Sequence, residues 1–151
     1  MITDTSLLTP IWVCCENDPD RKNVLVCVDG SENSYRAVDH AGYVLSHAEH
    51  HNITLFHVNS GGSANEKEIF TRAETILLEN GIKSERVRSE STRGISVANS
   101  ILSEGNRGSY SAVVLGLHGE GDNLLETFGL MGGTTSTLIY KAEKFSLWCC
   151  P

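Results

Sequence analysis

Short apolar runs and segments of helical periodicity alternate along this chain. The apolar runs predict strands over residues 10–15, 23–28, 53–58, 112–115 and 145–150. Apolar residues recur at helical spacing after Ser31, between Ser63 and Gly81, over 94–102 and over 135–142. Strands and helices therefore take turns from residue 23 onward. This order predicts an α/β fold, an open doubly wound parallel sheet with helices on both faces.

Polar residues indicate where elements begin and end. Ser31 is expected to cap the helix that follows it. Ser63 and Glu66 have the spacing of a capping box, and Gly81 suits the C-terminal end of the same helix. A further strand over 85–90 is far more polar than the others, so we expect it at a sheet edge.

The first residues differ from the rest of the chain. Residues 1–9 are expected to form a flexible lead, and residues 16–21 form a polar linker that contains proline. We therefore divide the chain into an N-terminal extension, 1–22, with an extra strand, and one domain, 23–151. A chain of 151 residues is long enough for a single domain with a substantial core.

Bulk composition narrows the range of partners. The net charge is −7, whereas proteins that bind nucleic acid or anionic membranes are normally basic, so we expect neither partner. No apolar run approaches the roughly 20 residues that span a bilayer. The N-terminus lacks the pattern of a secretory signal, and a cytoplasmic location is the expectation.

Cysteine and serine residues give no pattern of a metal or catalytic site. Cys14 and Cys15, like Cys149 and Cys150, are neighbours in strand-like runs, where adjacent side chains point to opposite faces. We therefore expect structural thiols. The G-x-S-x-G pattern of a hydrolase nucleophile is absent from the sequence.

The stretch 112–136 carries the main functional signal. A buried strand, 112–115, runs into a glycine-rich loop that ends in Gly133-Thr134-Thr135-Ser136 before a helix. Glycines let the backbone approach a ligand closely, and free N–H groups at a helix start attract anions. The layout predicts an anion site, with phosphate as the expected anion. A glycine-rich surface loop without a ligand is the alternative.

Two strand ends are expected to meet at this site. The strand over 23–28 ends in Asp29-Gly30-Ser31, and the strand over 112–115 ends in Gly116-Leu117-His118-Gly119. Ligands of open parallel sheets bind beyond the carboxyl ends of the strands, where the strand order reverses. If these strands are neighbours at that point, both turns face one crevice.

These residues resemble the universal stress protein family, over about 23–150 of the chain. Nucleotide-binding members of that family have Gly-x-x-Gly, nine residues, and then Gly-Ser or Gly-Thr. Gly116 and Gly119 match the first part. Gly133 and Thr134 match the second part in chemistry, but the segment before them is longer than nine residues. The ends of the first two strands, Val26-Cys27-Val28-Asp29-Gly30-Ser31 and Phe56-His57-Val58, complete the likeness.

The resemblance implies a five-stranded parallel sheet in the order 3-2-1-4-5 and a pocket for ATP. It implies that Asp29 contacts the ribose or adenine side and that the backbone of Val58 meets adenine. The ribose and phosphates are then expected to contact Gly116, Gly119, Gly133 and Thr134, with the hydroxyl of Ser136 added.

The loop departs from the family pattern in its charge. It contains Glu120, Asp122 and Glu126, and no Lys or Arg lies between Arg107 and Lys141. Carboxylates repel a triphosphate unless a divalent cation neutralises them, so we expect Mg²⁺ or Mn²⁺ to accompany ATP.

The two ends of the chain resemble each other. Residues 10–15 read Pro-Ile-Trp-Val-Cys-Cys, and residues 146–151 read Ser-Leu-Trp-Cys-Cys-Pro. In the family, the last strand lies at a sheet edge and often pairs with the same strand of a partner. We therefore expect a homodimer through the last strand and the N-terminal strand. Descent from one half of a tandem chain and an ordinary N-terminal strand are the alternatives.

Three functions are consistent with this sequence. The first is a nucleotide-binding regulatory domain that acts through ligand-dependent conformation or dimerisation, with slow ATP hydrolysis at most. The second is a dimerisation module whose pocket has degenerated. The third is an enzyme that uses ATP to adenylate a substrate.

Overall fold

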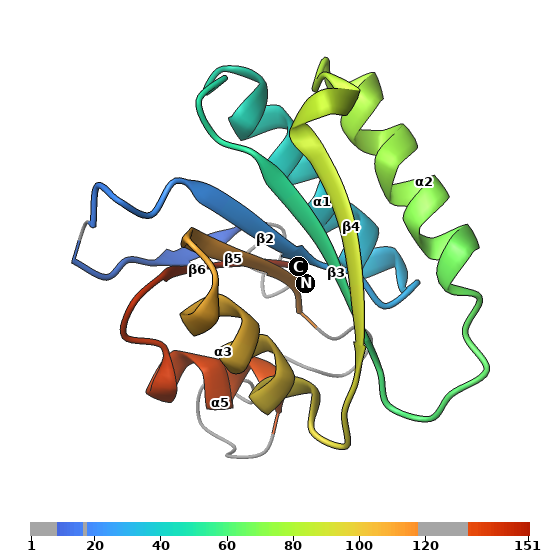
Figure 1. Cartoon of the computed structure of the whole chain (residues 1–151), viewed down its shortest axis with the longest axis vertical. Helices are drawn as coiled ribbons and strands as arrows, with labels where there is room; N and C mark the ends of the chain where they lie inside the picture. Colours follow the sequence, from blue (N-terminus) through green and yellow to red (C-terminus); the bar gives the residue numbers. More distant parts are fainter. Residues whose placement is uncertain (1–8, 17, 118–132) are drawn as a thin grey trace, which may run out of the picture.

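The computed structural model describes residues 9–16, 18–117 and 133–151, without the side chains of Thr135 and Ser136. Its strands are β1 (Ile11–Val13), β2 (Asn23–Cys27), β3 (Ile53–Asn59), β4 (Val87–Arg93), β5 (Tyr110–Gly116) and β6 (Ser146–Cys150). Its helices are α1 (Glu32–Ser46), α2 (Glu66–Glu79), α3 (Val97–Arg107), α5 (Thr134–Lys141) and the short 3-10 helix η3 (Ser84–Arg86). Strands and helices alternate from β2 onward, as the periodicity predicts (Figure 1).

The described strands form one sheet in the order β1-β6-β5-β2-β3-β4. All neighbouring pairs are parallel except β1 with β6, which is antiparallel. The chain moves outward from β2 to β4 and then returns to β5 on the other side of β2, so the strand order reverses between β2 and β5. The predicted α/β sheet with an extra N-terminal strand is confirmed, as is the place of the polar strand β4 at an edge.

Alternate side chains of the central strands supply two hydrophobic cores, one on each face of the sheet. Val24 and Val26 pack in the core with α1 and α2, and Leu25 packs in the core with α3 and α5. Figure 1 shows these two pairs of helices on opposite faces of the sheet. The period of two explains why the strands read as continuous apolar runs, because both of their faces are covered.

The start of β4 differs from the prediction because of one buried cation. Residues 84–86 form η3, and the strand begins at Val87 instead of residue 85. Arg86 is only 9% exposed, and its guanidinium donates to the carbonyl oxygens of Leu45, Ala48 and His51 at the end of α1. These hydrogen bonds join distant segments, which a local pattern does not show.

Two helix starts are also shifted. The capping box at Ser63 is wrong, because Asn65 caps α2 by accepting a hydrogen bond from the Glu68 amide at 3.3 Å. The helix predicted over 94–102 begins later and ends later, at Val97–Arg107, with Ser96 as its cap. The cap of α1 is Ser31, as predicted. Among the described helices, none is long and apolar enough to cross a membrane.

Candidate functional site

A cavity of about 270 Å³ lies at the carboxyl ends of β2, β3 and β5, where the strand order reverses. The start of α1, the loop after β3, the side of α3 and the start of α5 complete its walls. This is the place at which open α/β sheets bind ligands. Of the residues predicted from the sequence, the structure brings Asp29, Val58, Gly116 and Thr134 to its lining.

The floor of the cavity is apolar. Phe56 and Leu115 contribute from the strands, and Val97 and Ile101 from α3. Cys27 also lines the floor, and burial raises the pKa of its thiol to about 12. The thiol is therefore neutral at physiological pH, and this part of the cavity suits an uncharged, flat group.

Asp29 is held in a tight turn between β2 and α1. Its carboxylate oxygen Oδ1 accepts a hydrogen bond from the Ser31 amide at 2.9 Å. Gly30 has φ +87°, a backbone conformation that would be strained for a residue with a side chain. Glycine therefore lets the chain turn directly from Asp29 into α1. Ser31 then caps the helix through the Ser34 amide at 3.2 Å. Asp29 therefore stands before the cap residue, at the rim of the cavity, and does not itself cap α1.

The turn after β5 lies directly against the start of α1. A Cβ atom on Gly116 would be 2.5 Å from the backbone carbonyl group of Asn33 and 2.7 Å from the Ser34 amide nitrogen. The side-chain amide of Asn33 also donates a hydrogen bond to the carbonyl oxygen of Leu117. Only glycine permits this approach, and the predicted convergence of the two turns is confirmed.

The remaining predicted residues are placed less completely. Gly133 is the residue before α5, and a Cβ atom added there would meet no heavy atom of the described residues within 4 Å. Thr134 begins the helix. Ser136 lies in the first turn of α5, but its side chain is outside the described part. Gly119 and the acidic residues of 120–132 also lie outside the described residues.

Several polar residues of the cavity were not predicted from the sequence. Asn59 and Ser60 follow Val58 at the end of β3, and Ser34 faces the cavity from α1. The sequence does contain a signal for them, because polar residues directly after a buried strand, or in the first turn of the next helix, lie where a parallel sheet binds its ligand. His57 is buried, and its Nδ1–H donates to the carbonyl oxygen of Val28 at 2.8 Å, which ties the ends of β2 and β3 together.

The cavity carries little charge. Among the described residues that line it, Asp29 is the only Asp or Glu, and none is Lys or Arg. An anionic ligand would therefore contact backbone N–H groups and hydroxyls in this part of the chain. The start of α5 supplies such N–H groups, together with the positive end of its helix dipole.

Fold and cavity together define an α/β protein with a ligand-sized cavity at the switch point of a parallel sheet. The model of the Universal stress protein family matches residues 20–144, and the chain belongs to this family. No curated protein matches the chain.

Solved structures of the same family share the fold at low identity. A universal stress protein in complex with cAMP is 14% identical, with a TM-score of 0.68 over 87% of this chain and 98% of that one. A family member from Arabidopsis thaliana with AMP bound is 17% identical, with a TM-score of 0.63 over 85% and 90%. The universal stress protein from Archaeoglobus fulgidus in complex with dAMP is 18% identical, with a TM-score of 0.60 over 87% and 99%.

Proposed function

We propose that this chain is a regulatory domain that binds an adenine nucleotide, ATP above all, in the cavity at the ends of β2, β3 and β5. The observation that carries the proposal is the convergence of Asp29, Val58, Gly116 and Thr134 on that one cavity. Nucleotides in three related structures, cAMP, AMP and dAMP, support the same ligand class.

Each part of the cavity suits one part of such a ligand. The apolar floor around Ile101 accepts adenine, and the backbone of Val58 offers hydrogen bonds to its edge. The carboxylate of Asp29 accepts from ribose hydroxyls or the adenine amine. In this proposal the phosphate end lies toward Gly116 and the start of α5, where N–H groups of the first helical turn and the Thr134 hydroxyl meet it. Gly133 and Ser136 are proposed as further phosphate contacts of the same turn. Gly119 completes this set in our proposal.

The bound nucleotide acts in this proposal as a regulator, with slow hydrolysis at most. Its occupancy sets the conformation of the domain or its assembly into a homodimer at the sheet edge where the last strand and the N-terminal strand lie. The triphosphate is accompanied by Mg²⁺ or Mn²⁺, because the sequence supplies carboxylates and no Lys or Arg between residues 107 and 141.

Calorimetric titration of the full chain with ATP and Mg²⁺, and separately with AMP, tests the proposal. We expect saturable binding with one site, and we expect Asp29→Asn to weaken it about ten- to hundredfold, since a charged hydrogen bond contributes roughly 1.5–3 kcal/mol. Asp20→Asn is the matched control, because Asp20 is exposed in the linker before β2 and lies outside the cavity. Absence of heat and of a thermal shift with either ligand at millimolar concentration would leave the dimerisation module as the better function.

A further inference from the structure

The edge of the sheet at β6 is covered by a strand that resembles β6 itself. β1 pairs with β6 in antiparallel register, with Trp12 opposite Trp148, Ile11 opposite Cys149 and Val13 opposite Leu147. The two strands have matching sequences around their tryptophans, Ile-Trp-Val and Leu-Trp-Cys. In this register each strand meets its own counterpart, as two identical strands do across a twofold axis.

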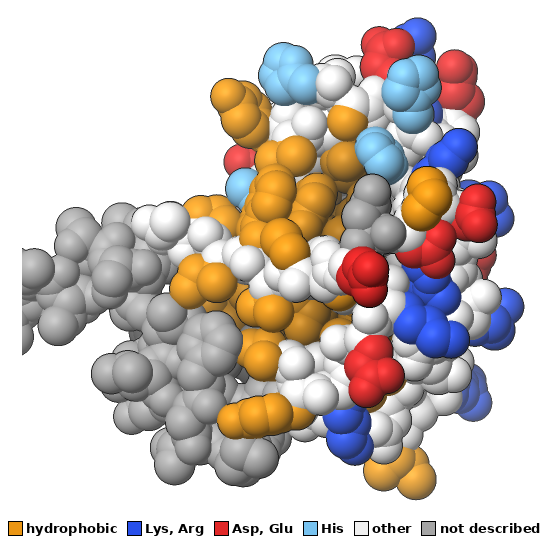
Figure 2. Space-filling view, turned by 90° about the vertical axis from the view of Figure 1, so that its left-hand side faces the viewer, with side chains coloured by type: hydrophobic (Ala, Val, Ile, Leu, Met, Phe, Trp, Pro, Cys, Tyr) orange, Lys and Arg blue, Asp and Glu red, His pale blue; other side chains and the backbone are white. Residues whose placement is uncertain are grey.

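The tryptophans form the centre of this pseudo-twofold pair. Their rings stack with centroids 4.3 Å apart and planes 8° from parallel. His40 of α1 closes the cluster, because Trp12 donates from Nε1 to Nε2 of His40 at 3.1 Å. Figure 2 looks onto this side of the molecule and shows hydrophobic side chains gathered at its centre, with histidine side chains around them.

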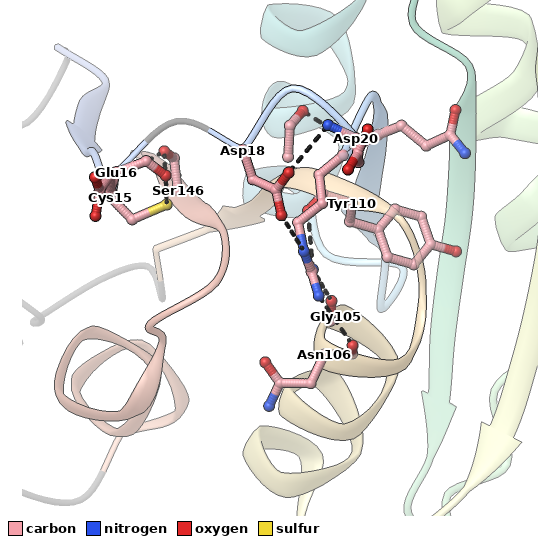
Figure 3. Close-up of polar contacts among 11 residues, drawn as sticks. Cys15, Glu16, Asp18, Asp20, Gly105, Asn106, Tyr110 and Ser146 are labelled. Carbon is pink, nitrogen blue, oxygen red and sulfur yellow. Dashed lines mark hydrogen bonds and ion pairs between the residues drawn. The ribbon is translucent and has the colours of Figure 1, made fainter.

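The segment between β1 and β2 is fastened to its own chain at both ends. The Cys15 amide donates to Oγ of Ser146 at 3.2 Å, directly after β1. Before β2, the guanidinium of Arg21 donates to the carbonyl oxygens of Gly105, Asn106 and Tyr110 at 3.0–3.2 Å (Figure 3). These contacts keep β1 at a high effective concentration next to β6 of the same chain.

Without β1, the edge of β6 would be a strong template for another strand. β6 is longer than β1, and Leu147, Cys149 and Cys150 in it are buried. Such apolar edges pair readily with other chains unless they are covered. β1 has three residues and follows Pro10, which has no backbone N–H, so its own outer edge is a poor template.

We propose that β1 takes the place of β6 of a second copy, so that the surface of β6 recognises itself and β1 competes for it within each chain. Release of β1 then lets two copies associate β6 to β6, with Trp148 against the partner's Trp148. Pairing within one chain and pairing between two chains exclude each other, because both use the same edge. This inference goes beyond nucleotide binding and stands if no nucleotide binds.

A thiol placed in β1 tests the register within the full chain. Ile11→Cys brings a thiol opposite Cys149, and we expect mild oxidation to give an intrachain disulfide, identified by peptide mass spectrometry. Ile11→Cys with Cys149→Ser, oxidised in parallel, is the control. An interchain disulfide at these positions would overturn the proposal.

Sedimentation of a variant with weakened β1 tests the competition. Trp12→Ser with Val13→Asp removes the contacts of β1 on both faces of the sheet, and we expect self-association at least about tenfold tighter than in the unchanged chain. Adding Trp148→Lys places like charges opposite each other across the twofold axis and is expected to abolish that gain. Leu78→Ser, at an exposed position of α2, controls for general surface effects.

The proposal is contradicted if the folded β1 variant self-associates no more tightly than the unchanged chain. Circular dichroism establishes whether the variant is folded. If it is not, the oxidised Ile11→Cys chain decides the question, because its β1 is fixed. Self-association through β6 is the part of the association that Trp148→Lys removes. It must be absent from the oxidised chain, in which β1 stays on β6. Its presence there would refute the competition.

Discussion

Gly116 sets how closely the end of β5 approaches α1. A side chain there would overlap the backbone of Asn33 and Ser34, which cannot move without shifting the first turn of the helix. We expect Gly116→Ala to lower the free energy of unfolding by about 1–3 kcal/mol, as overpacking of a tight contact does. Urea unfolding measures it.

The matched control for that change is Gly62→Ala, in the loop after β3. A Cβ atom at Gly62 meets no heavy atom of the described chain within 4 Å, and the backbone there has no positive φ. Its stability is expected to equal or slightly exceed that of the unchanged chain. If both variants lose the same free energy of unfolding, the close approach of residue 116 to α1 is not the cause of the loss.

The thiols of this chain differ in reactivity because they differ in burial. Burial raises the pKa of Cys27 and Cys150 to about 12 and that of Cys149 to about 11, whereas Cys14 is exposed. The thiolate is the reactive form, so at pH 8 a group with pKa 12 is ionised to only about 1 part in 10⁴.

We therefore expect a thiol reagent at pH 8 to modify Cys14 first in the folded chain and Cys27, Cys149 and Cys150 only after unfolding. The rate of colour release from an aromatic disulfide reagent measures both reactions. The fast phase, without denaturant, reports the exposed thiol, and the further release in guanidinium chloride reports the buried thiols. Cys27→Ser should leave the fast phase intact, and its loss in that variant would contradict the assignment.

At the scale of elements, the contact between β1 and α1 depends on the charge of His40. Nε2 of His40 accepts a hydrogen bond from Trp12, so the ring is neutral at that nitrogen, and burial lowers its pKa below the usual 6.5. The unfolded chain therefore takes up the proton first as pH falls. The stability from this residue is fully present above about pH 6.5 and decreases as pH falls toward the lower folded pKa.

Comparison of unfolding at pH 7.5 and pH 5.5 measures this effect. The unchanged chain should lose more stability between these two pH values than His40→Gln, which does not titrate. His47→Gln, an exposed position at the end of the same helix, should behave like the unchanged chain. A pH dependence identical in the unchanged chain and His40→Gln would exclude His40 as the group responsible.

The sequence predicts the elements of this fold well because each depends on local periodicity. Alternation predicts the parallel α/β sheet and the polarity of β4 predicts its edge position, whereas the full strand order comes from the family resemblance. The strand-end residues Asp29 and Gly116 are predicted to face one crevice, and both line the cavity. Boundaries that depend on distant partners were not predictable. Arg86 fixes the start of β4 through carbonyl groups in the last turn of α1 and in the segment after it, and Ile101 reaches the cavity only because α3 packs over the sheet.

The whole molecule presents an unusual electrostatic setting for a nucleotide. Its net charge is −7, the cavity has one carboxylate among its described lining residues, and the segment from 108 to 140 has no Lys or Arg. A ligand with four negative charges is repelled by this field, and a neutral nucleoside is not. In the proposed complex, the contacts with adenosine and the field that opposes phosphate thus act on different parts of the same ligand.

Salt and divalent cations should separate these two contributions. Without a divalent cation, ATP affinity is expected to rise with ionic strength between about 20 and 200 mM, because salt screens repulsion over a Debye length that falls to about 8 Å near 0.15 M. Adenosine affinity should not change over the same range, and Mg²⁺ should strengthen ATP binding while leaving adenosine binding unchanged. Calorimetry in matched buffers measures all three. If ATP affinity instead falls as salt is added, positively charged groups of the protein attract the phosphates. The net negative charge of the chain would then not govern which nucleotide this cavity holds.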